Sequence, residues 1–238
     1  MPPDETRRLT MGAVPFTMDA VMFTGLVETI GKVVAAEASA AGLRLRVDLG
    51  KAAEGVQPGD SIALGGICQT VAAVDGAVAA FDAVAETLAR TTVAQWRPGT
   101  RLNVERSLRP GDRLGGHFVA GHVDGIGKVL ENGRRADGWW LRVEAPQDLF
   151  AEIAPKGSIA IDGVSLTVVE AQTPVLSVTL IPTTLRDTTL GGLAVGDAVN
   201  LETDVLAKYV RRALAAMAGG DASDRRLLEL LGRSGFID

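Results

Sequence analysis

The chain has 238 residues, a formal net charge of −5, 22% charged and 47% hydrophobic residues, and a single cysteine. Its basic residues form isolated pairs and no cluster, which argues against a nucleic-acid partner. The longest uncharged stretch, residues 61–74, is shorter than the roughly 18 residues needed to cross a bilayer, and one cysteine excludes an intramolecular disulfide. We therefore expect a globular protein of the cytoplasm, with no nucleic-acid or membrane partner.

Residues 1–21 are predicted to be an N-terminal extension, partly disordered and outside the fold. Pro15 and Asp19 interrupt the only apolar run that could form the core of a signal peptide, which disfavours secretion. Met22 and the methionines before it are each possible start sites.

The rest of the chain carries the same sequence twice, about 97 residues apart. Residues 58–71 match residues 155–168 at seven of fourteen positions. The same offset aligns two further pairs of segments: 86–92 with 183–189, and 99–105 with 196–202. A repeat of this length is too long for a solenoid unit and suits a small domain. We therefore predict two copies of one domain, residues 22–115 and 116–203, which could supply two similar pockets, and a separate C-terminal segment, residues 204–238.

Each copy contains short segments rich in Val, Ile, Leu and Thr, separated by Gly, Pro and Asp at intervals of about 8–12 residues. In the first copy these segments are 43–49, 61–64, 69–74, 77–84 and 101–105, and in the second they are 139–144, 158–161, 166–170, 176–181 and 198–202. Many short strands with regular turns are typical of an all-β barrel or sandwich, and we predict that each copy is a six-stranded antiparallel barrel. One helical turn is expected at residues 86–88 and another at 183–185.

The pattern changes at Asp204. Apolar residues then recur at spacings of three and four from Val205 to Met217, Asp204 can act as the N-cap, and a glycine pair ends the run. This pattern predicts an amphipathic helix, followed by a second, short helix at residues 224–231. The apolar face of the first helix either packs on its own barrel or seals an oligomer, since a helix beyond two closed barrels has little other core to cover.

Both histidines, His117 and His122, lie in a glycine-rich segment, residues 115–125, where the second copy begins. Five positions apart on a strand, they face opposite sides, which does not favour a shared metal ion. Each is either a hydrogen-bonded structural residue or a ligand-binding one, and the flanking glycines favour binding for His122. We predict no metal site, and the chain has none of the usual nucleotide, dinucleotide or zinc motifs.

Two hydroxyl or thiol side chains lie at equivalent positions of the two copies. Cys68 and Thr70 in the first copy, like Ser165 and Thr167 in the second, are two residues apart and therefore face the same way on a strand. They either hydrogen-bond a polar heterocycle in twin pockets or are ordinary strand residues and a small buried cysteine. Neither Ser165 nor Cys68 has a base beside it in the sequence, which does not favour a hydrolase.

Comparison of the copies separates shared ionisable residues from unique ones. Glu105 and Glu202 occupy equivalent positions and are interpreted as structural. Lys156, Asp162 and Asp204 occur in the second copy only, and are either solvated surface residues or carry unequal chemical roles.

Several ordered motifs resemble the riboflavin synthase family, α-chain type: Met-Phe-Thr-Gly-Leu-Val-Glu at 22–28, Ile-Gly-Lys-Val at 30–33, the histidine-containing segment 115–125, and residues 161–168 and 180–185. The resemblance implies two Greek-key barrels and a helix that assembles a homotrimer, in which the first barrel of one subunit faces the second barrel of its neighbour. It also implies a dismutation in which one 6,7-dimethyl-8-ribityllumazine gives a four-carbon unit to another, yielding riboflavin and 5-amino-6-(D-ribitylamino)uracil without cofactor or metal. Lumazine synthase is a further candidate partner.

The resemblance also assigns residues to two substrate pockets. The first pocket is expected to be lined by Gly25, Leu26, Val27, Ser61, Cys68, Gln69, Thr70, Asp82, Ala83, Val84, Ala85, Glu86, Thr87, Gly121, His122 and Val123. The second is expected to be lined by Lys156, Ser165, Leu166, Thr167, Leu180, Ile181, Pro182, Thr183, Thr184 and Leu185.

In this reaction one lumazine loses a proton from its C7 methyl group while the other is attacked at C7. Holding the two rings face to face makes the encounter intramolecular, and effective molarities can reach about 10⁵ M or more. We hypothesise that His122 and Ser165 assist proton transfer and that Asp204 and Lys156 polarise or orient the second substrate. Cys68 is the remaining catalytic candidate.

Two residues depart from the family pattern Asn-Gly-Val-Cys-Leu-Thr: Gly65 replaces the asparagine and Gln69 the leucine, which we expect to weaken the first pocket. Relatives that lose catalysis serve as lumazine- or flavin-binding proteins with a degenerate second barrel. Here Lys156, Ser165 and Thr167 are retained, which favours the enzyme over a non-catalytic binding protein. A β-barrel interaction module without a small ligand is the third alternative.

Overall fold

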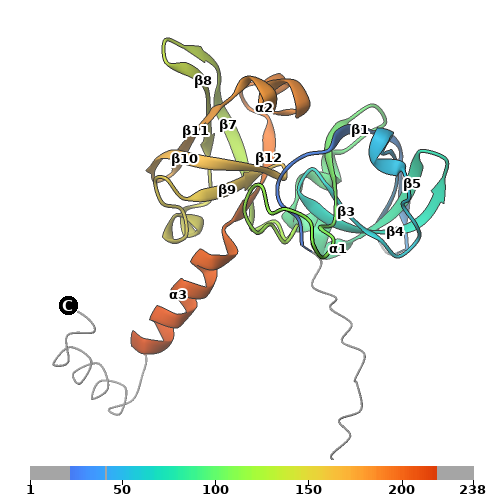
Figure 1. Ribbon diagram of the computed structural model, residues 1–238, viewed down its shortest axis with the longest axis horizontal. Coiled ribbons are helices and arrows are strands. Elements are labelled where there is room, and N and C mark those ends of the chain that lie inside the picture. The colour runs from blue at the N-terminus through green and yellow to red at the C-terminus, as the bar shows by residue number, and fades with distance from the viewer. Residues whose placement is uncertain (1–21, 41, 219–238) are drawn as a thin grey trace, which may run out of the picture.

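The computed structural model describes residues 22–40 and 42–218, which form two barrels and a projecting helix (Figure 1). The strands of the first barrel are β1 (Thr29–Ser39), β2 (Gly42–Asp48), β3 (Ser61–Leu64), β4 (Ile67–Asp75), β5 (Val78–Val84) and β6 (Arg101–Arg106). Those of the second are β7 (Gly125–Arg135), β8 (Gly138–Glu144), β9 (Ser158–Ile161), β10 (Val164–Gln172), β11 (Val175–Leu180) and β12 (Ala198–Thr203).

Both barrels are closed, antiparallel and of one topology. Hydrogen bonding joins the first in the order β1-β2-β5-β4-β3-β6, and the second follows the same circular order. The chain passes from β2 to the β3-β4-β5 meander, and the last strand of the meander, β5, pairs with β2. This connection makes each barrel a Greek key. The predicted all-β fold of two six-stranded barrels is confirmed, and β1 and β7 supply the strand that was not delimited from the sequence.

Short helices follow the strands where helical turns were expected. These are α1 (Ala85–Arg90) and α2 (Pro182–Asp187), with 3-10 turns η1 (Gly50–Ala53), η2 (Thr92–Gln95), η3 (Gln147–Ala151) and η4 (Leu190–Gly192). α1 follows β5 and α2 follows β11, so the two helices occupy equivalent places in the two barrels.

Each barrel has its own apolar core, because alternate residues of every strand point inward. Leu45 and Phe81 are fully buried in the first barrel, and Leu141 and Ile159 in the second. Burial of each such side chain stabilises the fold by roughly 1.5–3 kcal/mol. The two cores are separate, so each copy of the repeat is a domain in the physical sense.

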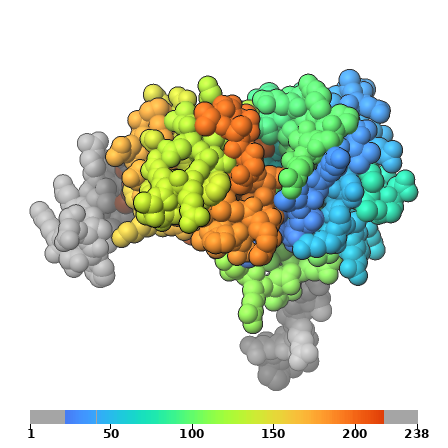
Figure 2. Space-filling view, turned by 90° about the horizontal axis from the view of Figure 1, so that it is seen from above, coloured from blue at the N-terminus to red at the C-terminus, as the bar shows by residue number. Residues whose placement is uncertain are grey.

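The barrels pack side by side (Figure 2) through contacts that repeat with the offset of the duplication. Asn103 donates from Nδ2 to the carbonyl of Asp162 at 2.9 Å. Its equivalent Asn200 donates from Nδ2 to the carbonyl of Gly65 at 2.8 Å. Since both pairs join one barrel to the other, the duplication has produced a pseudo-twofold interface.

Two glycines meet at this interface. A Cβ atom on Gly66 would lie 2.5 Å from the backbone nitrogen of Gly163, and one on Gly163 would lie 2.7 Å from that of Gly66. Both have φ in the left-handed region, +79° and +77°. Any side chain here would separate the barrels.

Helix α3 (Val205–Ala218) leaves β12 and runs away from both barrels (Figure 1). Asp204 caps it as predicted, because its Oδ1 accepts the Leu206 N–H at 2.9 Å. None of the described helices has the length and apolar character that a membrane span requires. The predicted extension 1–21 and short helix 224–231 lie outside the described residues.

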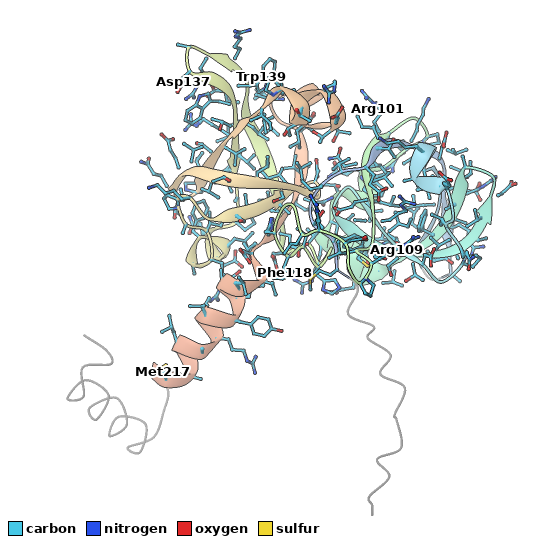
Figure 3. The ribbon with its side chains drawn as sticks, in the orientation of Figure 1. Arg101, Arg109, Phe118, Asp137, Trp139 and Met217 are labelled. Carbon is cyan, nitrogen blue, oxygen red and sulfur yellow. The ribbon has the colours of Figure 1, made fainter. Side chains whose placement is uncertain are left out.

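The basic side of α3, not its apolar side, faces its own barrel. Lys208 Nζ lies 2.6 Å from Asp124 Oδ2, and Arg211 Nη1 lies 2.7 Å from Glu152 Oε1. The large apolar side chains are exposed: Leu206, Tyr209, Val210, Leu214 and Met217. Figure 3 shows Met217 at the far end of the helix, away from both barrels. Of the two sequence-based alternatives for the apolar face, packing on its own barrel is wrong.

Candidate ligand-binding and catalytic site

Two segments cross between the barrels. We call residues 22–28, which precede β1, the first arm, and residues 119–124, which precede β7, the second arm. Phe23 and Val119 pair as an isolated antiparallel bridge, with the Phe23 N–H donating to the Val119 carbonyl at 2.8 Å. The arms therefore run past each other at the interface.

Each arm lies on the barrel to which it does not belong. The Gly25 carbonyl in the first arm accepts the Ser165 N–H of the second barrel at 2.8 Å. The Gly121 carbonyl in the second arm accepts the Cys68 N–H of the first barrel at 2.9 Å. A Cβ atom on either glycine would lie 2.6 Å from the Cβ of Ser165 or Cys68, and both φ values are near +75°, so only glycine fits.

This exchange creates two equivalent half-sites. The first half-site comprises Cys68, Ser61 and the second arm at Gly121, and the second comprises Ser165 and the first arm at Gly25. Cys68 and Ser165 are 97 positions apart, as the repeat requires.

The exchange corrects one sequence-based assignment. Gly25, Leu26 and Val27 were assigned to the first pocket, but Gly25 bonds Ser165 and Val27 packs against the core of the second barrel. Val123 packs against the core of the first barrel. The assignment was wrong because it assumed that the segment before β1 stays with its own barrel.

His117 contacts the hydroxyl of Ser165 in the second half-site. Its Nδ1 lies 2.7 Å from Ser165 Oγ, and the ring is only 8% exposed. Burial lowers the pKa of His117, and the nearby Asp204 carboxylate opposes this only in part, so the ring is neutral at pH 7. A neutral imidazole beside a hydroxyl can take its proton when Nε2 carries the ring hydrogen.

The sequence-based hypothesis paired Ser165 with His122, and not with His117, for proton transfer. His122 is exposed and follows Gly121 in the second arm, so it belongs with Cys68 and not with Ser165. No local signal marks His117, because its partner lies 48 positions away on a different element. The only hint is that His117 shares the glycine-rich segment with His122.

Cys68 is a neutral thiol. Burial raises its pKa, the Ser61 hydroxyl opposes the shift, and the charge of Glu202 adds to it. Nucleophilic cysteines need a lowered pKa. Cys68 is therefore suited to hydrogen bonding and packing in the first half-site.

The residues beside Cys68 and Ser165 alternate between the two sides of the barrel wall. Thr70 and Thr167 are exposed on the outer side. Gln69 and Leu166, only 6% and 8% exposed, point into the barrel cores. Only their backbone groups can face an outer ligand.

The predicted pocket residues at the ends of β5 and β11 also divide between surface and core. Ala83 and Leu180 are buried, whereas Val84 and Ile181 are 50% and 63% exposed. Asp82 is engaged by Arg44 on the outer surface. The remaining members of these two groups lie in or next to the short helices and are exposed or half-buried: Ala85, Glu86, Thr87, Pro182, Thr183, Thr184 and Leu185.

Lys156 and Asp204 lie on two different elements that join the second barrel. Lys156 is exposed in the turn before β9 at φ +68°, and its N–H donates to the carbonyl of Val168, three residues along β10 from Ser165. Asp204 caps α3 and acts on His117 through its charge.

Gly65 lies at the barrel interface and lines a cavity of about 240 Å³ there with Asp162 and Trp96. The expectation that Gly65 alters the first pocket is therefore wrong. Asp162, its equivalent in the repeat, accepts the Asn200 N–H at Oδ1, and burial raises its pKa to about 7.

Among the described residues, no three His, Cys, Asp or Glu side chains form a cluster that could hold a metal ion. The half-sites offer backbone amides, hydroxyls, a thiol and the imidazoles of His117 and His122, groups that can bind a polar heterocycle and move protons on it.

Two barrels of one fold with exchanged arms define a protein with paired ligand-binding half-sites. The family model of the lumazine binding domain matches the chain twice, over residues 24–107 and 120–204. The chain is 45% identical over 196 residues to riboflavin synthase of Mycobacterium tuberculosis, covering 80% of this chain and 97% of that protein. It is 41% identical over 196 residues to that of Brucella abortus (80% and 97%) and 34% over 215 residues to that of Actinobacillus pleuropneumoniae (90% and 100%). The chain belongs to the riboflavin synthase family of lumazine-binding proteins.

Solved structures show the same fold. The protein LumP complexed with 6,7-dimethyl-8-(1'-D-ribityl) lumazine superposes with a TM-score of 0.69 and 26% identity, covering 76% of this chain and 99% of that one. LumP complexed with riboflavin gives a TM-score of 0.69 and 27% identity at the same coverage.

Proposed function

We propose that the protein is a riboflavin synthase that converts two molecules of 6,7-dimethyl-8-ribityllumazine into riboflavin and 5-amino-6-(D-ribitylamino)uracil. The observation that carries the proposal is the pair of half-sites, alike in backbone geometry and unlike in side chains. Two molecules of one substrate need two similar binding sites. Because one molecule donates a four-carbon unit and the other accepts it, the two sites need different catalytic side chains. The similarity to LumP in complex with lumazine and riboflavin supports binding of ligands of this class.

Ser165 and His117 supply the proton-transfer groups of the second half-site. The hydroxyl donates or accepts a proton at the substrate while the neutral ring, 2.7 Å away, holds it in place and shares the proton. At the first half-site the neutral Cys68 thiol and the exposed His122 line the second arm. Positioning of the two rings supplies much of the rate, because it removes the entropy cost of their encounter.

The complete site is proposed to form in a homotrimer. Leu26 and Ile181 near the second half-site, and Val84 near the first, are all at least half exposed in the single chain. The apolar side of α3 is exposed as well. A neighbouring subunit that packs on α3 and brings its other half-site opposite would cover both kinds of surface.

Two further proposals concern the setting of the enzyme. A free, uncharged cysteine suits the reducing cytoplasm, where we propose that the protein acts. Because a lumazine-forming enzyme must supply the substrate, lumazine synthase is the proposed partner.

The deciding assay is incubation of the purified protein with 6,7-dimethyl-8-ribityllumazine, with no metal or cofactor added. Riboflavin and the diaminouracil should appear in equal amounts. Lumazine that is bound but not converted would support a non-catalytic binding protein, the alternative that the likeness to LumP keeps open.

A further inference from the structure

Two buried glutamates hold the arms. Glu105, on β6, accepts the Thr24 N–H and hydroxyl at Oε1, each at 2.7 Å, and the Gly25 N–H at Oε2 at 3.0 Å. Glu202, on β12, accepts the Ala120 N–H at 2.6 Å and the Gly121 N–H at 2.9 Å. The two residues are only 6% and 3% exposed, so these bonds are shielded from water.

The arms that these carboxylates hold complete the opposite barrels. Glu105 belongs to the first barrel, yet the arm that it holds packs Gly25 against Ser165 of the second. Glu202 belongs to the second barrel, yet the arm that it holds packs Gly121 against Cys68 of the first. Each carboxylate therefore accepts a hydrogen bond directly from the glycine that packs on the other barrel.

We propose that Glu105 and Glu202 are positioning residues that act crosswise, each fixing from its own barrel the arm that completes the half-site of the other. Each half-site is thereby built only when both barrels are folded and docked. The inference rests on the proposed function, since it assigns these residues a part in seating the two lumazines.

The charge state of Glu202 makes this positioning depend on pH. Burial raises the pKa of Glu202 to about 7, although the two arm amides and Lys208 of α3 favour the charged form and Asp124 disfavours it. The charge of Glu202 in turn raises the pKa of the Cys68 thiol. Protonation turns one carboxylate oxygen into an O–H donor, which cannot accept from an amide, so the second arm loses a hydrogen bond as the pH falls through about 7.

Hydrogen exchange of the full-length protein tests the geometry. Glu202→Gln should lower the protection of the Ala120, Gly121 and Cys68 amides by about 10-fold while leaving the Thr24 and Gly25 amides unchanged, because a charge-assisted bond is lost. Glu105→Gln should do the reverse, lowering the protection of the Thr24, Gly25 and Ser165 amides. Glu170→Gln, an exposed glutamate of β10, is the matched control and should change neither. Exchange that rises in both arms alike in each variant would overturn the crosswise assignment.

A second measurement uses the wild type alone. The protection factor of the Gly121 amide should fall as the pH drops below about 7. A wild-type protection factor that stays flat across this range would overturn the inference.

Riboflavin binding and turnover complete the test. Glu202→Gln should weaken riboflavin binding and raise KM for the lumazine by about 10-fold with a smaller effect on kcat, because the arm seats the ring without touching the reacting atoms. Wild-type protein that binds riboflavin but does not convert lumazine would refute the proposed function alone. Conversion with unchanged KM in both glutamate variants would refute the positioning role alone.

Discussion

His117 Nδ1 and Ser165 Oγ lie 2.7 Å apart across the junction of the two barrels. Ser165 is on β10, whereas His117 lies in the link that leads from the first barrel to the second. The equivalent residue to Ser165 in the first barrel is Cys68, whose pKa is influenced by the nearby Ser61 hydroxyl and not by a histidine. The two half-sites therefore differ in the group beside this strand residue: a histidine beside Ser165 and a serine beside Cys68.

The first prediction concerns Ser165. Ser165→Ala should lower kcat by about 10²-fold, the lower end of what a positioned acid or base contributes, with little change in KM. Steady-state kinetics with 6,7-dimethyl-8-ribityllumazine measure both. Ser39→Ala is the control, since Ser39 lies at the end of β1 and its buried hydroxyl has no hydrogen-bond partner among the described residues. Full kcat in Ser165→Ala would remove the residue from the mechanism.

The second prediction concerns His117. If it acts through the serine, His117→Asn and Ser165→Ala should each lower kcat, and the double variant should be no slower than Ser165→Ala. Independent, multiplying losses would contradict the pairing. Because burial lowers the pKa of His117, the neutral ring contributes stability above pH 6.5 that is lost as the pH falls through the lowered pKa. Thermal unfolding of His117→Asn should therefore show a smaller loss of Tm in acid than the wild type.

The repeat and the strand pattern predicted the barrels, because a closed barrel follows from local alternation and turns within each copy. The capping of α3 by Asp204 could also be predicted, because it joins residues only two positions apart in the sequence. The pairing of His117 with Ser165 and of Gly25 with Ser165 could not be predicted, because both depend on how two finished barrels dock. The sequence-based prediction did assign Gly121 to the first pocket but failed to apply the same exchange to Gly25, its counterpart before the first barrel.

The third prediction concerns Asp162, whose pKa burial raises from 3.8 to about 7. Its protonated form stabilises the fold fully below the unfolded pKa, and this contribution is lost as the pH rises through about 7. Asp162→Asn keeps an oxygen for the Asn200 N–H and tolerates the local φ of +46°. It should therefore raise Tm at pH 8 by about 3 °C and have little effect at pH 4. Calorimetry at the two pH values measures this, and a stabilisation that is equal at both would contradict the pKa.

The fourth prediction concerns Gln69. Its side chain points into the first barrel between Ile67 and Val71, where the second barrel has Leu166. A fully buried, unpaired amide costs about 1–3 kcal/mol relative to an apolar group, and the mostly buried Gln69 amide carries part of that cost. Gln69→Leu should raise the free energy of unfolding by about 1 kcal/mol, measured by urea denaturation. A destabilised variant would mean that the amide is satisfied inside the barrel.

The last prediction tests assembly through α3. Val210 is 58% exposed on the apolar side of the helix, opposite the side on which Lys208 and Arg211 bind the second barrel. If the apolar sides of three helices pack together, Val210→Asp buries an unpaired charge and should convert trimer to monomer in light scattering. Ala215→Asp places the same charge on the basic side of the helix, one turn beyond Arg211, where Ala215 is exposed, and should leave the trimer intact. Because each complete site is proposed to join half-sites of two subunits, Val210→Asp should also lose turnover. A monomer with full activity would show that one chain seats both lumazines alone.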